Sequence, residues 1–437
     1  MFRKVLFTIF ILLLMTGFVV AEDKSDIILE KGLPEITDKP TNISMLSVWR
    51  KDVAHQAEID FINNIVKRYY PNVDVEIEML NTNDLKNVVT TRIIAGVPPA
   101  LAHVASGYNI SKWATQGALV DMTKYWEKYN LEEIIPQGIS QTFMFNGRYY
   151  GLPLSYTQIN IFYWDKDILQ EAGVRQPPYE TWKEFFEIAK KFNEQEDIPF
   201  YADGLSPAWY AIERTLGLVP ERYDMDIYER IINGKATAKD FKIALSFHKE
   251  LLRYANEDYV SVNNTAGNIQ IVVRGNAATA WQGAWGYTTF EKEGKILHKN
   301  YDYGQLRGYC VSLIITAGYL VFKGSGHEKV AEAIAVCSML KESQILLNKS
   351  KGNPPARTDI ELNVDDFSEM VVYSANYTSK VPTYPRITVA LPDSVKSDYT
   401  PIITGYLAGS ASLEETIEKL LKIQEKYQDK FSMTWNL

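Results

Sequence analysis

The residue patterns that commonly mark catalytic sites are missing from this chain of 437 residues. It has no GxSxG turn for an acyl-transfer nucleophile, no GxxxxGK[ST] phosphate-binding loop and no GxGxxG dinucleotide loop. The five histidines are scattered and neither CxxC nor HExxH occurs, so neither a metal site nor a cofactor is predicted. Glycoside hydrolysis stays open, because its two carboxylates have no fixed spacing and 54 acidic residues are present.

Aromatic side chains are more informative than the catalytic motifs. The chain has 27 Tyr, 18 Phe and 9 Trp. A core can absorb all of them, but a protein that binds flat apolar faces in water needs the same residues. The aromatics that matter for binding are therefore those at strand ends and loops, because ligands of open α/β sheets bind at the carboxyl ends of strands.

Strand and helix patterns alternate along the first part of the chain. A predicted strand at 43–48 precedes a helix over 52–69, and a strand at 73–77 precedes a helix over 83–95. A further short strand follows at 100–104. Repeated βα units predict a largely parallel sheet that is covered by helices on both faces.

Two long β-prone runs, 154–164 and 311–322, interrupt this alternation. The first has 11 residues, which reach about 36 Å when extended, more than a strand of ordinary length needs. Helix-start signals then recur at Thr181, Ser206-Pro207 and Thr237, and Ser412 caps a last amphipathic helix to about Phe431. We therefore expect a second α/β lobe from about residue 160, with both runs crossing between the lobes.

The strand-end rule nominates binding residues in the first lobe. Trp49, Lys51 and Asp52 follow the first strand, where the ring can stack and the charged groups can hydrogen-bond; Trp49 packing the lobe edge is the alternative. Ser106 and Tyr108 follow the third strand, beside a glycine that lets a ligand approach backbone N–H groups.

The same rule nominates residues further along the chain. Ser155 and Tyr156 lie early in the first crossing, where we expect the floor of a cleft, with hinge packing as the alternative. Asp203 follows a short strand at 198–201, and Trp209 lies in the first turns of the next helix, where a purely core role is equally compatible.

The first 21 residues predict export. Arg3 and Lys4 precede an uncharged apolar run to Val20, and the segment closes on Val19-Val20-Ala21, which is typical of a signal peptide cleaved near Ala21. An uncleaved anchor is the alternative. No cysteine stands at the cleavage point, so we do not expect a lipoprotein. The mature chain would carry 44 basic and 54 acidic residues, which disfavours nucleic-acid binding.

Cys310 and Cys337 are the two cysteines of the chain. In an exported protein they can form a disulfide that closes a loop of roughly 27 residues, worth about 3 kcal/mol in the chain-entropy model. Cys337 also fits the apolar side of a predicted helix as a small buried residue. The sequence leaves both readings open.

Several motifs resemble one known family. The chain has NGRYYGLP at 146–153, FYWDKDIL at 162–169, EAGV at 171–174, and PP and TW at 177–178 and 181–182. These resemble, in order and spacing, the extracellular solute-binding proteins of ABC importers, family 1, a carbohydrate-binding group that includes maltose-binding proteins. Similar pieces at 95–100, 275–285 and 409–415 extend the resemblance over roughly residues 43–425, although Ala100 stands where the family usually has an acid.

The resemblance implies an α/β fold of two Rossmann-like lobes joined by a hinge of crossing segments, like type II periplasmic binding proteins. We expect an N-terminal lobe from 22–154 plus about 316–358 and a C-terminal lobe from 155–315 plus about 359–437. It further implies a monomeric, non-enzymatic protein in the periplasm or another extracytoplasmic space. This protein would hold a sugar or oligosaccharide in the interlobe cleft and deliver it to membrane permease subunits.

The resemblance also adds candidate contacts. The loop that contains Trp281, Gly283 and Trp285 corresponds to a family loop that faces the cleft with an aromatic platform. Arg357 and Arg386 are possible polar clamps for hydroxyls, carboxylates or phosphate, with a solvated surface charge as the alternative. If both arginines face the cleft, an acidic sugar or glycerophosphate gains weight over a neutral sugar.

Two rivals to a binding protein remain. One is an exported glycoside hydrolase or lyase that uses two carboxylates in the same cleft. The other is an adhesion or scaffold protein whose cleft binds nothing.

Overall fold

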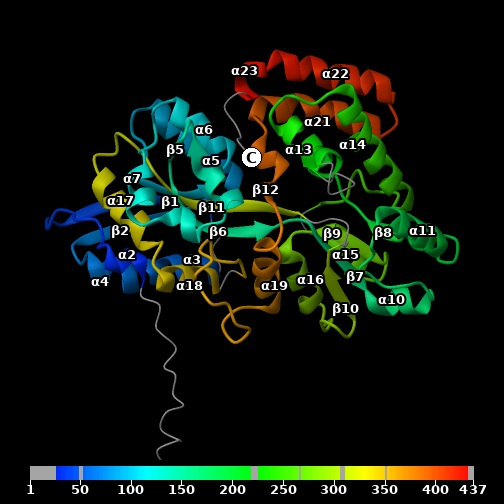
Figure 1. Cartoon of the computed structure of the whole chain (residues 1–437), viewed down its shortest axis with the longest axis horizontal. Helices are drawn as coiled ribbons and strands as arrows, with labels where there is room; N and C mark the ends of the chain where they lie inside the picture. The colour runs from blue at the N-terminus through cyan, green and yellow to red at the C-terminus, as the bar shows by residue number, and fades with distance from the viewer. Residues whose placement is uncertain are drawn as a thin grey trace, which may run out of the picture.

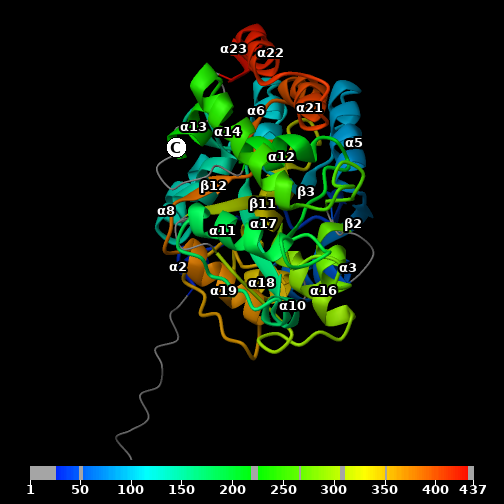
Figure 2. The same ribbon diagram turned by 90° about the vertical axis from the view of Figure 1, so that its right-hand side faces the viewer.

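The computed structural model describes residues 26–48, 53–217, 225–264, 267–305, 311–349 and 352–431. Figure 1 shows two lobes side by side, and Figure 2 views the molecule from the side of the second lobe. Within these residues no helix combines the length and the apolar character that crossing a membrane would require.

The first lobe is built on a mixed sheet. Strands β1 (Thr41–Ser47), β2 (Val73–Met79) and β3 (Leu101–Ala105) are parallel, in the order β2-β1-β3. The long strand β11 (Ser312–Val321) pairs antiparallel with β3, so a late segment of the chain completes the sheet. The predicted βα alternation of this region is confirmed, because each strand is followed by a helix that returns the chain to the other end of the sheet.

Helices cover both faces of this sheet, with α5 and α6 on one side and α3 and α18 on the other (Figure 1). A π-helical stretch, Phe61–Val66, continues α3 and leads into α4. The further elements are α2 (Ile27–Glu30), α3 (Val53–Asp60), α4 (Lys67–Tyr69), α5 (Thr82–Ile94), α6 (Tyr108–Thr115), α7 (Thr123–Lys128), α8 (Leu131–Ile134), α9 (Gln137–Ser140), the hairpin β4 (Met144–Phe145) and β5 (Arg148–Tyr149), α17 (Glu328–Cys337) and α18 (Lys341–Lys349).

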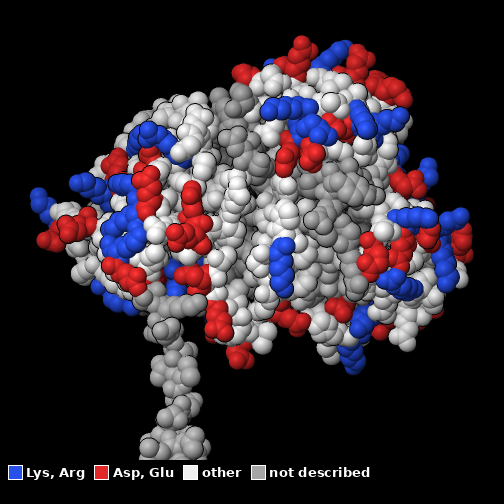
Figure 3. Space-filling model, in the orientation of Figure 1, with Lys and Arg blue, Asp and Glu red and all other residues white. Residues whose placement is uncertain are grey.

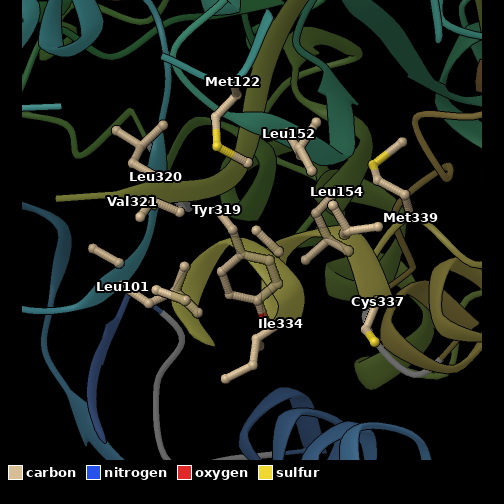
Figure 4. Packing of buried hydrophobic residues seen from close by; sticks show 14 of the residues in the cluster. Leu101, Met122, Leu152, Leu154, Tyr319, Leu320, Val321, Ile334, Cys337 and Met339 are labelled. Atoms are coloured by element: carbon tan, nitrogen blue, oxygen red, sulfur yellow. The ribbon is translucent and has the colours of Figure 1, made fainter. Parts of the chain in front are cut away.

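The core of the first lobe joins residues that are far apart in sequence. Figure 4 shows Leu101, Leu152 and Tyr319 packed together, and Cys337 lies at the edge of the same cluster. Cys337 is a free, fully buried thiol. Its burial in the apolar cluster agrees with a small buried residue, while Cys310 lies outside the described residues and its pairing with Cys337 stays a prediction.

The second lobe has its own sheet of four strands in the order β10-β7-β9-β8. Its strands are β7 (Ile161–Asp165), β8 (Tyr201–Ala202), β9 (Thr279–Gln282) and β10 (Tyr301–Gly304). Its helices are α10 (Lys166–Glu171), α11 (Trp182–Asn193), α12 (Tyr210–Gly217), α13 (Met225–Ile232), α14 (Ala238–Leu251), α15 (Gly267–Val273), α16 (Tyr287–Lys292), α19 (Glu369–Thr378), α20 (Ile387–Ala390), α21 (Asp393–Leu407), α22 (Leu413–Lys426) and α23 (Gln428–Phe431).

Helix-capping side chains start several of these helices at the predicted places. The Thr181 hydroxyl accepts from the Glu184 N–H, and Thr237 forms a reciprocal capping box with Asp240. Ser412 likewise caps α22. The helix start predicted at Ser206-Pro207 is wrong, because Ser206 forms a β-bridge with Asn263 and α12 begins only at Tyr210.

The lobes are joined by the two predicted crossings. The run from Leu154 to Trp164 is two strands rather than one: β6 (Leu152–Gln158) pairs with β11 in the first lobe, and β7 belongs to the second. β11 spans its run as one strand, which begins beside β12 (Thr383–Pro385) and ends beside β3. Asn160, at the break, accepts from the Leu313 N–H and donates to the Val311 carbonyl, so its side chain ties the two crossings together.

Candidate functional site

A polar pocket lies where the two crossings enter the second lobe. The space that it encloses is about 10 Å³, room for about one water molecule, and it opens to solvent. Loops, β9, α12 and the β12–α20 turn supply its walls, which are formed by Ile159, Asn160, Glu213, Arg214, Asn264, Gln282, Trp285, Leu313 and Arg386. An aromatic ring, three amides and charged groups thus converge on one small volume, the composition expected of a site for a polar ligand.

Trp285 supplies the aromatic wall, and Gly283 is the reason that its ring can lie there. A Cβ built on Gly283 would come within 2.1 Å of the Trp285 ring, so any larger residue would displace the indole. The Tyr163 hydroxyl donates to the Gly283 carbonyl over 3.0 Å and fixes the loop from beneath. Trp285 is half-buried, which leaves part of the ring available to a ligand.

Arg386 forms the opposite, charged wall. Its Nε donates to Glu213 Oε2 over 2.8 Å, and its guanidinium lies 5.0 Å from the Trp209 ring centroid. Burial opposes the charged form, but the carboxylate of Glu213 raises the pKa of Arg386 above its ordinary value. The Tyr210 ring stacks on Trp209 with centroids 3.8 Å apart and lies 5.3 Å from the same guanidinium, so both rings pack against Arg386.

Three amides give the pocket its hydrogen-bonding capacity. Asn264 donates to the Gly204 carbonyl, and Gln282 donates to Asn268 Oδ1 over 2.8 Å. Together with Asn160 they come from three separate segments, and their contacts to the chain orient them. Preset amide groups suit a ligand that presents several hydroxyls, because each can donate and accept.

Asp203 lies behind the pocket rather than in it. Its carboxylate is fully buried, 3.2 Å from Arg214 Nε and 3.1 Å from His248 Nε2. Burial alone would raise its pKa, but Arg214 and His248 hold the pKa of Asp203 below its ordinary value. The network positions Arg214 in the pocket wall, and direct ligand contact by Asp203 stays a prediction.

Trp281 lies in the core of the second lobe. It is 1% exposed, and its ring centroid lies 4.4 Å from Phe162 and 5.0 Å from Trp182. Alternation along β9 explains the difference from its neighbour, because Trp281 faces α11 while Gln282 faces the pocket. The structure therefore brings Trp285 and Gly283, but not Trp281, to the pocket.

The candidates of the first crossing and third strand belong to the first-lobe side of the hinge. Ser155 and Tyr156 are 2% and 5% exposed and pair with β11. Ser106 is buried, and its hydroxyl bonds to that of Thr316. Tyr108 is half-buried at the first turn of α6, where burial and the charge of Asp393 raise its pKa. Of these residues, Tyr108 is placed where the two lobes face each other.

Arg357 is placed away from the pocket. It is 3% exposed and binds Asp26 over 2.9 Å and Asp359 over 2.7 Å, so it fastens the start of the described chain to the first lobe. Trp49, Lys51 and Asp52 lie outside the described residues, and their role stays a prediction.

Sequence reasoning nominated only Trp285 and Arg386 among the nine lining residues and missed the other seven. Asn160, Glu213, Arg214, Asn264 and Gln282 reach the pocket, and Leu313 closes it from the second crossing. Gln282 was detectable, because it stands between two nominated residues of one loop. Glu213 and Arg214 had no local signal, since α12 reads as an ordinary helix and only the tertiary fold turns them inward.

The chemistry that this arrangement supports is binding. Glu213 is the one carboxylate among the described lining residues, and its Oε2 already accepts from Arg386 and Thr388. Glycoside hydrolysis generally needs two carboxyl groups on either side of the bond that breaks. Across the described chain, no group of three His, Cys, Asp or Glu residues is arranged to hold a metal ion.

Comparison with known proteins identifies several relatives. Residues 64–375 match the family model described as bacterial extracellular solute-binding protein. An uncharacterised ABC transporter extracellular-binding protein of Pyrococcus horikoshii is 24% identical over 402 residues, 90% of this chain and 89% of that protein. A probable sugar-binding periplasmic protein of Rhizobium meliloti is 22% identical over 359 residues, 77% and 82% of the two chains.

A solved structure shows the same fold. A chitin oligosaccharide binding protein superposes with a TM-score of 0.72 and 16% identity, over 90% of this chain and all of that one. The two-lobed, type II architecture predicted from the sequence is confirmed by this likeness. At that identity the likeness concerns the fold.

Proposed function

Because this chain belongs to the family of bacterial extracellular solute-binding proteins, we propose that it captures a sugar or oligosaccharide for an ABC importer. The observation that carries this proposal is the hinge pocket, in which the Trp285 ring faces three oriented amides and the Arg386–Glu213 pair. A sugar offers a flat C–H face to an indole and hydroxyls to amides. The relatives that are named as sugar-binding proteins support the same ligand class.

Binding works by a shift of population between open and closed arrangements of the lobes. A ligand closes the cleft only by as much as it binds the closed arrangement better than the open one. Each hydrogen bond contributes about 0.5–1.5 kcal/mol, and an aromatic contact contributes about as much. A micromolar dissociation constant corresponds to about −8 kcal/mol, so these contacts together must exceed the cost of association by that amount.

The rest of the expected biology follows from this role. The protein acts as a monomer outside the cytoplasm after cleavage near Ala21, without a lipid anchor or nucleic acid, and hands its sugar to permease subunits. Residues 22–154 with about 316–358 form one lobe, and 155–315 with about 359–437 form the other. Separate hydrophobic cores support a division into two lobes, because one core contains Ile43 and Ile334 and another contains Phe162 and Tyr399.

A melting-temperature screen tests the proposal. Purified protein is heated with mono-, di- and oligosaccharides, and a true ligand at 100 times its dissociation constant should stabilise the fold by about 2.7 kcal/mol. Trp285→Ala should abolish the shift, whereas Trp285→Phe keeps a flat ring and should retain part of it. Full retention of affinity in Trp285→Ala would place the site elsewhere, and no shift with any ligand would favour the scaffold reading.

Turnover separates the binder from the rival hydrolase or lyase. The sugar found in the screen is incubated with the protein and analysed for shorter products over hours. We expect stoichiometric binding and an unchanged sugar. Catalytic release of products that is lost in Glu213→Gln would overturn the non-enzymatic role.

A further inference from the structure

The aromatic wall of the pocket belongs to a short turn, residues 283–286, which we call the Trp285 turn. Trp285 lies in the middle of a 3₁₀-helical segment, Ala284–Gly286, and the Gly286 N–H donates to the Gly283 carbonyl over 2.9 Å. The turn follows β9 directly and continues into α16. Its conformation therefore sets the position of the half-buried indole in the pocket wall.

Tyr163 of β7 contacts this turn from the core side. Its hydroxyl lies 3.0 Å from the Gly283 carbonyl and 3.2 Å from the Ala284 carbonyl, and it can donate to both. A Cβ built on Gly286 would come within 2.9 Å of the Tyr163 ring, so the ring packs directly against the turn. One side chain thus contacts three of the four residues of the Trp285 turn.

Tyr163 is itself held in place by the core. It is fully buried, and β7 places it opposite Tyr303 on one side and Ala280 on the other. Its ring stacks on Phe290 with centroids 6.0 Å apart, and Phe290 stacks on Tyr301 at 4.2 Å. The hydroxyl of Tyr163 is therefore a fixed point of the core to which the Trp285 turn is attached.

This attachment matters for binding because of the cost of ordering a loop. Tyr163 is not among the described residues that line the pocket, so it acts only through the turn. A ligand that must first order the turn loses that part of its affinity. If the competent arrangement of the turn fell to about a tenth of the population, the apparent dissociation constant would rise about tenfold.

We propose that Tyr163 is a positioning residue of the sugar site, whose buried hydroxyl holds the Trp285 turn in the arrangement that presents the indole to the ligand. This inference rests on the proposed sugar-binding function. The hydroxyl, and not only the ring, is required, because it is the hydroxyl that bonds to the carbonyls of Gly283 and Ala284.

Tyr163→Phe tests the proposal, because it removes the hydroxyl and keeps the ring against Phe290. Isothermal titration uses maltose, chitobiose, xylobiose and galactose, together with any sugar found in the melting-temperature screen. We expect the dissociation constant of the tightest sugar to rise about tenfold. Tyr301→Phe is the matched control and should bind like the parent: Tyr301 is fully buried on the same Phe290, but its hydroxyl has no hydrogen-bond partner within the described residues.

Fluorine NMR follows the turn without any ligand. The protein is labelled with 5-fluorotryptophan at its nine tryptophans, and Trp285→Phe identifies the signal of Trp285. In free Tyr163→Phe protein this signal should shift or broaden, because the turn has lost its attachment. Tyr301→Phe should leave it unchanged. A general loss of stability would not move the Trp285 signal alone.

Gly286→Ala approaches the same contact from the turn and keeps the test decisive if Tyr163→Phe fails to fold. Gly286 has φ −58° and ψ −36°, which alanine adopts without strain. The added methyl group would meet the Tyr163 ring at 2.9 Å and push the turn away from it. We expect weaker sugar binding and a changed Trp285 signal, as for Tyr163→Phe.

The outcomes separate the positioning role from the proposed function. If Tyr163→Phe binds as tightly as the parent, or if Tyr301→Phe loses as much affinity, the positioning role is overturned while sugar binding stands. A loss of affinity with an unchanged Trp285 signal overturns it as well, because the turn is then not the cause. If the parent binds none of the sugars, the proposed function fails, and the fluorine signals still decide whether Tyr163 holds the turn.

Discussion

Arg386 and Glu213 form an ion pair in which both side chains are less than a tenth exposed. Removing one member of such a pair leaves the other charge buried without a partner, which costs about 3–5 kcal/mol. Arg386→Met should therefore destabilise the fold by about 3 kcal/mol in urea unfolding. The double variant Arg386→Met with Glu213→Gln should recover much of this loss, because no buried charge is then left without a partner. A double variant as unstable as the single one would show that the unpaired charge of Glu213 is not the cause of the loss.

His298 gives the molecule a pH-dependent contact outside the pocket lining. Hydrogen bonds with Glu369 at 2.8 Å and Asp302 at 3.2 Å raise its pKa above the ordinary value. A raised pKa in the folded state stabilises the fold at low pH, and this contribution is lost as the pH rises through the folded pKa. Because the side chain is 60% exposed, the contribution should not exceed about 1 kcal/mol.

His298→Asn tests this contact, since asparagine tolerates the positive φ of 61° at this position. Thermal unfolding should show a lower melting temperature than the parent at about pH 5.5 and little difference at about pH 9. An equal loss at both pH values would mean that the charge of His298 is irrelevant.

Single residues also show where sequence reasoning succeeds. Trp285 was predictable, because a recognisable loop and a glycine two residues earlier specify its position. Trp281, four residues away, has the same side chain but lies on the core face of β9. Only the strand register separates the two, and register is decided by pairing with the distant strand β7.

At the scale of elements, the approach of α6 to α20 determines how far the lobes close. Gly107→Ala would place a methyl group 2.7 Å from the Val389 carbonyl oxygen, which is backbone and cannot rotate away. Overpacking of this kind costs about 1–3 kcal/mol. Because the clash exists only when the lobes touch, affinity for the sugar should fall about tenfold or more in isothermal titration.

Gly117→Ala is the matched control for that prediction. Gly117 also has a positive φ, 68°, but an added Cβ there would meet nothing within 4 Å. Both variants should lose stability through the backbone, by about 1–2 kcal/mol. Only Gly107→Ala should lose ligand affinity, and equal affinities for the two variants would mean that α6 and α20 do not meet in the bound protein.

The elements themselves were predicted well where their signals are local. Thr181, Thr237 and Ser412 each start a helix at the expected residue, because a capping side chain acts on backbone only three residues away. The break at Asn160 was not predicted, since nothing in an uninterrupted β-prone run marks where it changes partner. That position depends on Val311 and Leu313, which lie more than 150 residues later.

At the scale of the whole molecule, the position of the pocket couples ligand binding to the closure of the two lobes. Its lining includes Asn160 and Leu313, one from each crossing, so a ligand there touches the segments about which the lobes turn. On the face shown in Figure 3, acidic and basic residues are interspersed on both lobes, so this face offers no field of one sign that would steer the motion. Ligand binding then changes the balance between open and closed forms at two places, the pocket and the contact between α6 and α20.

Solution scattering should detect this coupling directly. The sugar identified by the melting screen, added at saturation, should reduce the radius of gyration, because ligand contacts on both sides of the hinge favour the closed arrangement. Trp285→Ala at the same sugar concentration should keep the radius of the free protein, which excludes an effect of the sugar on the solvent. A tight complex whose radius equals that of the free protein would contradict closure, and would place the binding energy within the second lobe alone, where most of the pocket lining resides.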